Sequence, residues 1–431
     1  MAASSQSLDF LLARGIGETD PELAGLLTAE LDRQRGQIEL VASENFTWTG
    51  ALQAMASPGA NKLADGYPGH RETGGCERID AIEQMAIGRL LDLFGAEHAN
   101  VQTHSGAQAN MAVYFACLEP GDTMLAMSVQ HGGHHTHGQQ GNFSGRFYRV
   151  VSYGVERDTG LIDFAQVRAL AREHRPKLIV CGGSAYPRQI DWAAFRQIAD
   201  EAGAYLLCDM AHVAGLVAAG LHPSPVAVAD FITSTVHKTL AGPRCGGFVL
   251  CRREHAAAID QAVSPGTQSA PFPHLIAAKA VCFKAAASEA FRGYQRQVCA
   301  NASALAGALA GRGLGLLAGG TDTHLLMLEL SAAQPGAQAA EQLLASAGIT
   351  VSKYPVPFDP RLPAGVSGLR MGTPAITMRG FTEAATRAVG EIIADALAGN
   401  GHPGLLRERA RALCDQHPLY PGWRGYFGLG G

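Results

Sequence analysis

Thr233-Ser234-Thr235-Val236-His237-Lys238-Thr239 is a β-branched run that ends at a single lysine. The run continues a strand that begins near Asp230, and a glycine-rich turn over 242–247 leads from it into a second strand. Ligands bind at the carboxyl ends of strands in open α/β sheets, and lysine condenses with carbonyl groups. Lys238 is therefore a candidate Schiff-base lysine, although a lysine in a turn is more often a solvated charge.

A second apolar run, residues 204–208, delivers Asp209 at its end. An aspartate in this place can cap a following helix. It can also face the ring nitrogen of pyridoxal phosphate, because a carboxylate there keeps the ring protonated and makes it an electron sink. We expect Asp209 and Lys238 to hold opposite sides of one such cofactor.

The chain length predicts two domains that share a cleft, since 431 residues exceed what one hydrophobic core usually organises. We predict an N-terminal arm over 1–40, a large cofactor-binding domain over 41–290 and a small domain over 291–431. Strand, loop, helix and strand follow one another over 177–208, which indicates parallel βαβ units. Strand candidates at 324–330 and 349–352 make the small domain α/β as well.

The charge and composition exclude several classes of partner. A net charge of −4 gives no general attraction to nucleic acid or to an anionic membrane. Neither a secretory signal nor an apolar run of about 20 residues is present, so we expect a soluble cytoplasmic protein. The nine cysteines are scattered without Cys-x-x-Cys spacing, which favours reduced thiols in the core.

Several polar stretches are candidate sites. The turn Ser105-Gly106-Ala107 enters a helix and is either a phosphate seat or an ordinary cap. Four histidines fall within 131–137, but no matching carboxylate or cysteine spacing accompanies them, so we predict no metal and one ring-stacking histidine. The glycine-rich stretch 61–77 is a functional loop, and Arg370 is either a carboxylate clamp or a surface arginine.

Seven motifs in order carry a family resemblance over nearly the whole chain: Val41-Ala42-Ser43-Glu44-Asn45-Phe46, Gly66-Tyr67-Pro68-Gly69, Gly74-Gly75-Cys76-Glu77, His104-Ser105-Gly106, Asp209-Met210-Ala211-His212, His237-Lys238-Thr239-Leu240 and Gly372-Thr373-Pro374-Ala375. The chain resembles serine hydroxymethyltransferases. The resemblance implies the α/β fold type I of pyridoxal-phosphate-dependent transferases, with a mainly parallel seven-stranded sheet and a smaller α/β domain. It also implies pyridoxal 5'-phosphate and a homodimer, with tetramers left open, whose active sites are built from both subunits.

The same resemblance assigns roles to individual residues. It makes Lys238 the Schiff-base lysine, Asp209 the pyridinium partner and His134 the stacking ring. The catalytic set is Lys238, Asp65, His237 and Thr235. The cofactor-binding set is Ser105, Gly106, Ala107, His134, Ser184, Asp209, His212, Lys238, Ser269 and Ala270. The substrate-binding set is Ser43, Tyr67, Thr73 and Arg370.

The chain departs from the family mainly where substrate and folate bind. Leu63, Asp65, Glu72 and Thr73 replace a tyrosine, a glutamate and two tyrosines of the family loop. His135 and Tyr354 are two further replacements, expected near the folate. Ser269-Ala270, Ala107 and Ala241 are replacements expected near the cofactor. These changes predict an intact cofactor site beside an altered folate site.

The retained residues are sufficient to cleave a β-hydroxy-α-amino acid into an aldehyde and a stabilised carbanion. Because aromatic bulk is lost from the loop, the pocket is expected to accept a larger substituent. We expect a folate-independent aldolase or transaldolase acting on α-methylserine, serine, threonine or phenylserine-type amino acids. A tetrahydrofolate-dependent hydroxymethyltransferase of serine or α-methylserine is the alternative, and a non-catalytic cofactor-binding scaffold is a third possibility.

Overall fold

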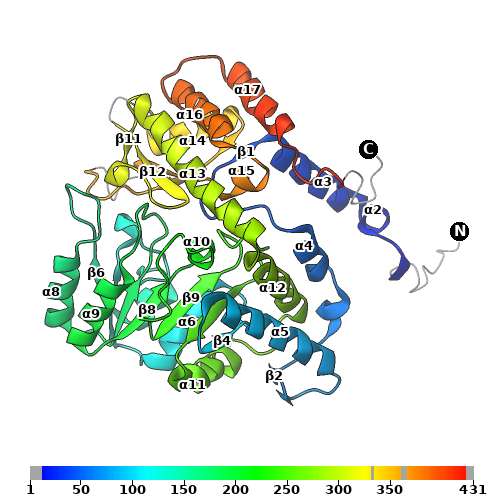
Figure 1. Ribbon diagram of the computed structural model, residues 1–431, viewed down its shortest axis with the longest axis vertical. Coiled ribbons are helices and arrows are strands. Elements are labelled where there is room, and N and C mark those ends of the chain that lie inside the picture. The colour runs from blue at the N-terminus through cyan, green and yellow to red at the C-terminus, as the bar shows by residue number, and fades with distance from the viewer. Residues whose placement is uncertain (1–11, 332–333, 361–365, 424–431) are drawn as a thin grey trace, which may run out of the picture.

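A seven-stranded sheet forms the centre of the larger part of the molecule (Figure 1). This computed structural model describes residues 12–331, 334–360 and 366–423, so the first eleven residues of the predicted arm lie outside the described residues. The strands follow the order β4 (His98–Asn100), β10 (Gly247–Cys251), β9 (Phe231–Thr235), β8 (Tyr205–Asp209), β7 (Leu178–Cys181), β5 (Thr123–Met127) and β6 (Arg149–Tyr153). β10 is antiparallel to both neighbours and all other pairs are parallel. The mainly parallel seven-stranded sheet is confirmed.

Helices cover both faces of this sheet. Successive side chains of a strand point to opposite sides, so neighbouring residues pack against different helices. Ile179 of β7 packs with Trp192 and Phe195 of α9, whereas its neighbour Val180 packs with Val113 of α6 on the other side. The covering helices include α5 (Glu77–Phe94), α6 (Gly106–Cys117), α8 (Phe164–His174), α9 (Trp192–Ala202), α11 (Ala256–Gln261) and α12 (Pro273–Ala286), and α4 (Thr49–Met55) packs on α12.

Local sequence signals place the ends of these elements. Asp191 caps α9 and accepts a hydrogen bond from the backbone N–H of Ala194 at 2.9 Å. Helix α5 ends at Gly95, whose φ of +71° is a left-handed conformation that glycine adopts without strain. The strand expected over 204–208 is β8, and Asp209 is its last residue. β9 ends at Thr235, so Lys238 lies in the turn that follows.

A second sheet of four strands, in the order β11 (Gly315–Leu316), β12 (Leu325–Glu329), β15 (Gly368–Gly372) and β14 (Ser352–Tyr354), has a core of its own. Figure 1 shows this sheet gathered above the larger one with α14 (Ala337–Ser346), α16 (Glu383–Leu397) and α17 (Pro403–Gln416). β1 (Ile38–Glu39) pairs with β13 (Ile349–Thr350), so Ile38 and Leu40 join the smaller core. The N-terminal region is therefore attached to the C-terminal part.

Two successive helices connect the larger part of the molecule with the smaller one. α12 ends at Ala286, and α13 (Glu289–Gly311) begins after Ser288, whose hydroxyl accepts from the N–H of Phe291. α13 joins the two cores, because Phe291 packs in the larger one and Leu305 in the smaller one. The predicted boundary at 290 falls at the start of this helix, and the division into domains stays a prediction. No helix in the described part of the chain has the length and apolar character needed to cross a membrane.

Candidate functional site

A cavity of about 350 Å³ lies where the carboxyl ends of β8 and β9 face the smaller sheet. Many of the predicted site residues line it: Ser43, Ser105, Gly106, Ala107, His134, Ser184, Asp209, His212, Thr235, His237, Lys238 and Arg370. They come from distant parts of the sequence and from both sheets. The fold therefore assembles most of the site that the sequence predicts.

Asp209 is held by three donors at the end of β8. Its Oδ2 accepts from His137 Nε2 and Asn110 Nδ2, each at 3.0 Å, and its Oδ1 accepts from the N–H of Ala211 at 3.0 Å. Burial alone would raise the pKa of Asp209, but its hydrogen bond with His137 and the charge of Lys238 hold it well below its usual value. Asp209 is therefore an ionised carboxylate facing the cavity.

His137 and Asn110 were not predicted as site residues, although both line the cavity. The backbone N–H of His134 donates to His137 Nδ1 at 3.3 Å, which leaves the proton of His137 on Nε2, where it bonds Asp209. The histidine cluster signalled that one ring would be used, but nothing in the spacing singled out His137. Asn110 lies on the first turns of α6, and only the packing of α6 beside β8 brings it to Asp209.

His134 presents a neutral, flat ring to the cavity. Both the hydroxyl of Thr136, at 2.7 Å, and its N–H, at 3.2 Å, contact His134 Nδ1, so this nitrogen is an acceptor. Burial and the neighbouring His137 lower the pKa of His134 to about 3. A neutral ring is suited to stack on an aromatic cofactor, as predicted for this residue.

Lys238 lines the same cavity as Asp209 and is 7% exposed. Burial lowers its pKa to about 8, partly opposed by Asp209 and reinforced by the charges of Arg370 and Arg244. Its backbone carbonyl accepts a hydrogen bond from Asn45 Nδ2 at 2.9 Å, which fixes the turn. Near neutral pH this amine loses its proton more readily than an exposed lysine, as a nucleophilic lysine requires.

Ser105 and Gly106 begin α6 at the edge of the cavity. The hydroxyl of Ser105 accepts from the N–H of Gln108 at 3.0 Å, so Ser105 is the helix cap. A Cβ on Gly106 would collide with the methyl group of Thr235, which explains why glycine stands there. The start of a helix presents free N–H groups and a positive dipole end, so the cap and phosphate-seat interpretations are compatible.

Arg370 reaches the cavity from β15 of the smaller sheet and is 7% exposed. It donates to the carbonyl of Ser184 at 2.8 Å and to Ser43 Oγ at 3.3 Å. Its guanidinium lies over the ring of Tyr354, 4.9 Å from the centroid. The surface interpretation is excluded, and a buried, oriented guanidinium in a cavity is suited to bind a carboxylate.

Five predicted residues do not line this cavity: Asp65, Tyr67, Thr73, Ser269 and Ala270. Asp65 accepts a hydrogen bond from Ser269 Oγ at 2.8 Å, so these two are together elsewhere. Tyr67 donates to the carbonyl of Asp260 at 2.6 Å, and Thr73 donates to the carbonyl of Leu63 at 2.9 Å. Within one chain the structure therefore separates the loop from the cofactor cavity.

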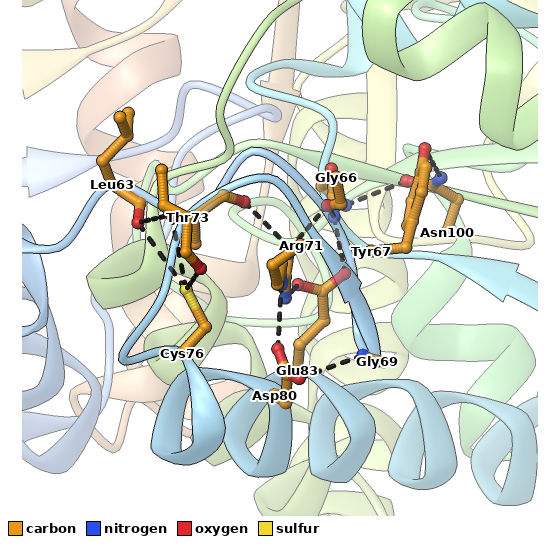
Figure 2. A network of polar contacts seen from close by, with 12 residues as sticks. Leu63, Gly66, Tyr67, Gly69, Arg71, Thr73, Cys76, Asp80, Glu83 and Asn100 are labelled. Carbon is orange, nitrogen blue, oxygen red and sulfur yellow. Dashed lines mark hydrogen bonds and ion pairs between the residues drawn. The ribbon is translucent and has the colours of Figure 1, made fainter.

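Figure 2 shows how the loop over 61–77 is attached to α5 through Arg71. The guanidinium donates to the carbonyls of Ala64 and Gly66, which flank Asp65. It also forms ion pairs with Asp80 at 2.8 Å and Glu83 at 2.6 Å. The backbone on both sides of Asp65 is thus fixed by one buried arginine.

Replacement of Arg71 by methionine is expected to lower the free energy of unfolding by about 3–5 kcal/mol, because it leaves the buried Glu83 without its cation. Urea unfolding followed by circular dichroism measures the change. Arg168→Met is the control, since its ion pair with Glu201 is partly exposed and contributes about 0–1 kcal/mol. Equal losses in the two variants would contradict the expectation.

The lining residues fit pyridoxal phosphate. Thr235 Oγ1 and His237 Nδ1 are buried at the cavity without a hydrogen-bond partner in the protein, and such atoms usually meet a ligand or water. An ionised aspartate, a lysine of lowered pKa and a helix start would provide partners for the ring nitrogen, the aldehyde and the phosphate. No group of three metal-ligating side chains that could hold an ion occurs in the described ranges.

Comparison with known proteins agrees with this chemistry. The family model described as "Serine hydroxymethyltransferase" matches residues 16–393. A serine hydroxymethyltransferase of Myxococcus xanthus (strain DK1622) is 53% identical over 410 residues, covering 94% of this chain and 98% of that protein. One from Synechococcus sp. (strain JA-3-3Ab) is 53% identical over 422 residues, covering 94% and 97%. The chain therefore belongs to the serine hydroxymethyltransferase family of pyridoxal-phosphate-dependent enzymes.

Proposed function

We propose that this enzyme transfers the hydroxymethyl group of serine, or of a Cα-substituted serine such as α-methylserine, to tetrahydrofolate. The observation that carries the proposal is that Lys238, Asp209 and Arg370 line one cavity. Two relatives of nearly equal length are named serine hydroxymethyltransferases, which supports folate as the acceptor. This reading replaces the folate-independent aldolase as the favoured function.

Each of these site residues has its own role in the reaction. Bound pyridoxal phosphate supplies the electron sink for the carbanion left when the Cα–Cβ bond breaks. Asp209, ionised and held by His137, keeps a proton on the ring nitrogen. Arg370 binds the substrate carboxylate and so orients the Cα–Cβ bond that breaks. The neutral ring of His134 would cover one face of the cofactor ring and exclude water from it.

The proton of the substrate hydroxyl needs a carrier, for which Asp65 is the candidate. Its carboxylate lies beside Ser269 and away from the cavity of its own chain. We infer that Asp65 acts in the cavity of a second copy, within a homodimer. The leucines of α3 (Pro21–Gly36) support an interface between copies, since Leu23, Leu26 and Leu27 are 43%, 65% and 37% exposed.

The folate-independent aldolase is the second candidate. His135 and Tyr354 line the cavity at positions where the family has an apolar residue and a folate-contacting asparagine. Tyr354 lies under Arg370 and donates to the carbonyl of Gly133 at 2.9 Å, so its ring is fixed beside the expected carboxylate site. A site changed in this way favours release of free aldehyde. A scaffold role has little support because the lining residues keep the chemistry described above.

Addition of tetrahydrofolate to the holoprotein is expected to accelerate cleavage of serine or α-methylserine by about tenfold or more, because the acceptor removes the aldehyde. Glycine or alanine, free formaldehyde and methylene-tetrahydrofolate would be measured with and without folate. Aldehyde release at the same rate without folate would establish the aldolase instead. Failure of every donor to react in cofactor-loaded protein would support the scaffold.

A further inference from the structure

Lys279 is a buried cation that the chemistry above does not use. It lies on α12, is 1% exposed, and does not line the cofactor cavity. Burying an ammonium group is costly unless its protons are bonded. The burial of Lys279 is therefore explained neither by contact with solvent nor by contact with substrate.

Each proton of this ammonium has a backbone acceptor. Lys279 Nζ lies 2.6 Å from the carbonyl oxygen of Val101, 3.0 Å from that of Thr103 and 2.7 Å from that of Gly247. An ammonium group has three donors, so these bonds use all of them. The protonated form is thus the one that this arrangement holds.

These carbonyls belong to the two segments that shape the start of α6. Val101 and Thr103 lead from β4 to Ser105, and Gly247 is the first residue of β10. The segments touch there, because the N–H of Gly247 donates to the carbonyl of Thr103 at 3.2 Å, and a Cβ on Gly247 would lie 2.9 Å from the carbonyl of Ser105. Lys279 therefore hydrogen-bonds to both segments beside the proposed phosphate seat.

The ammonium also brings an uncompensated positive charge to this place. No carboxylate in the described ranges lies within ion-pair distance of Lys279; Glu83 acts on it only through its more distant charge. The positive charge lowers the pKa of His104, the residue before Ser105, in addition to the effect of burial. A field that reaches His104 extends toward the seat, where it favours a phosphate dianion.

We propose that Lys279 is a positioning residue for the cofactor phosphate: it fixes the backbone that leads into Ser105 and adds a positive charge behind the phosphate. The inference rests on the proposed placement of the phosphate at Ser105, Gly106 and Ala107. It concerns binding of the phosphate group alone and makes no demand on which amino acid or acceptor the enzyme uses.

The test compares pyridoxal 5'-phosphate with pyridoxal, which lacks the phosphate, in equilibrium binding to the apoprotein. Lys279→Met is expected to weaken binding of the phosphorylated form by about tenfold or more, while binding of pyridoxal changes by less than about twofold. Lys279→Gln keeps two hydrogen-bond donors without the charge and should also lower the ratio of the affinities for pyridoxal 5'-phosphate and pyridoxal. This variant replaces Lys279→Met in the test if the methionine variant does not fold. Equal weakening of both ligands, or no weakening, would overturn the proposal.

Arg379→Met is the matched control. Arg379 is 7% exposed and, like Lys279, donates to backbone carbonyls, among them those of Arg35 at 2.8 Å and Cys414 at 3.0 Å, far from the cavity. The Arg379→Met variant should be less stable than the unmodified protein, but the ratio of its affinities for pyridoxal 5'-phosphate and pyridoxal should not change. Ser105→Ala separates the two hypotheses: if it leaves the ratio unchanged, the placement of the phosphate is wrong, whereas an effect there without one in Lys279→Met refutes the role of Lys279 alone.

The unmodified protein provides a second readout. Burial lowers the pKa of Lys279 to about 8, partly opposed by Cys245 and Glu83, so its charge is present below that pH and lost above it. The ratio of the affinities for pyridoxal 5'-phosphate and pyridoxal should therefore fall between about pH 7 and about pH 9.5, and by more than in Lys279→Gln, where Lys238 still titrates but the charge at position 279 is absent. Burial raises the pKa of Cys245 to about 11 and lowers that of His104, so neither changes charge in this window. A constant ratio would contradict the charge contribution.

Discussion

Lys238→Ala is expected to lower kcat/KM for cleavage by about 10⁴-fold, because no other lysine among the described residues lines the cavity and could link to the cofactor aldehyde. The purified variant should also lack the visible absorbance of a lysine-bound cofactor. A small primary amine such as methylamine, added to the assay, should restore part of the activity by taking the place of the missing side chain. Steady-state rates and absorbance spectra measure both effects.

Lys177→Ala is the control for this change. Lys177 lies on the surface and pairs with Asp122 at 2.6 Å, outside the cavity. Its loss should leave the rate and the spectrum unchanged. Activity above about one tenth of normal in Lys238→Ala, with the cofactor retained, would reject Lys238 as the reacting lysine.

Asp209→Asn is expected to reduce the rate by about 10²- to 10³-fold, since a neutral amide cannot keep a proton on the cofactor ring. Burial opposes ionisation of Asp209, but His137 and Lys238 overcome this and hold its pKa well below its ordinary value, so the carboxylate stays charged at the pH of the assay. The loss should therefore persist from mildly acidic to mildly alkaline pH. Rates measured over that range, together with the cofactor spectrum, test the assignment.

Two variants bracket this result. Asp209→Glu keeps the charge and should retain more activity than the amide variant. Asp163→Asn makes the same chemical change at a helix cap, where Asp163 accepts from the N–H of Gln166 at 2.8 Å and asparagine caps equally well. Normal activity in Asp209→Asn would show that the ring nitrogen has another partner.

The sequence predicts β8 because it is a short apolar run that ends at Asp209, and it predicts β9 because a β-branched run precedes Lys238. Carboxyl ends of neighbouring parallel strands lie at one edge of a sheet, so their convergence follows from topology. Arg370 was left between a clamp and a surface position, since nothing local shows that β15 brings it against Ser184. The family resemblance favours the clamp; the structure shows Arg370 buried at the cavity, and its contact with a substrate carboxylate stays a prediction.

Other parts of the site cannot be read from local patterns. His137 differs from its neighbouring histidines only in the backbone turn that turns its ring toward Asp209. Asp65 and Ser269 pair across a sequence separation that no periodicity encodes. Lys279 is part of an apolar helix pattern, and only the meeting of β4, β10 and α12 shows why a charge is tolerated there.

Arg71 holds the loop over 61–77 in place through two kinds of contact. Its guanidinium donates to the backbone carbonyls of Ala64 and Gly66 and forms ion pairs with the acidic residues of α5. The side chains of Leu63 and Glu72 are exposed and take no part in this attachment. Selection can therefore exchange these two residues while the path of the loop stays the same. A scaffold of this kind can diversify its chemistry by few substitutions, without first having to repair its folding.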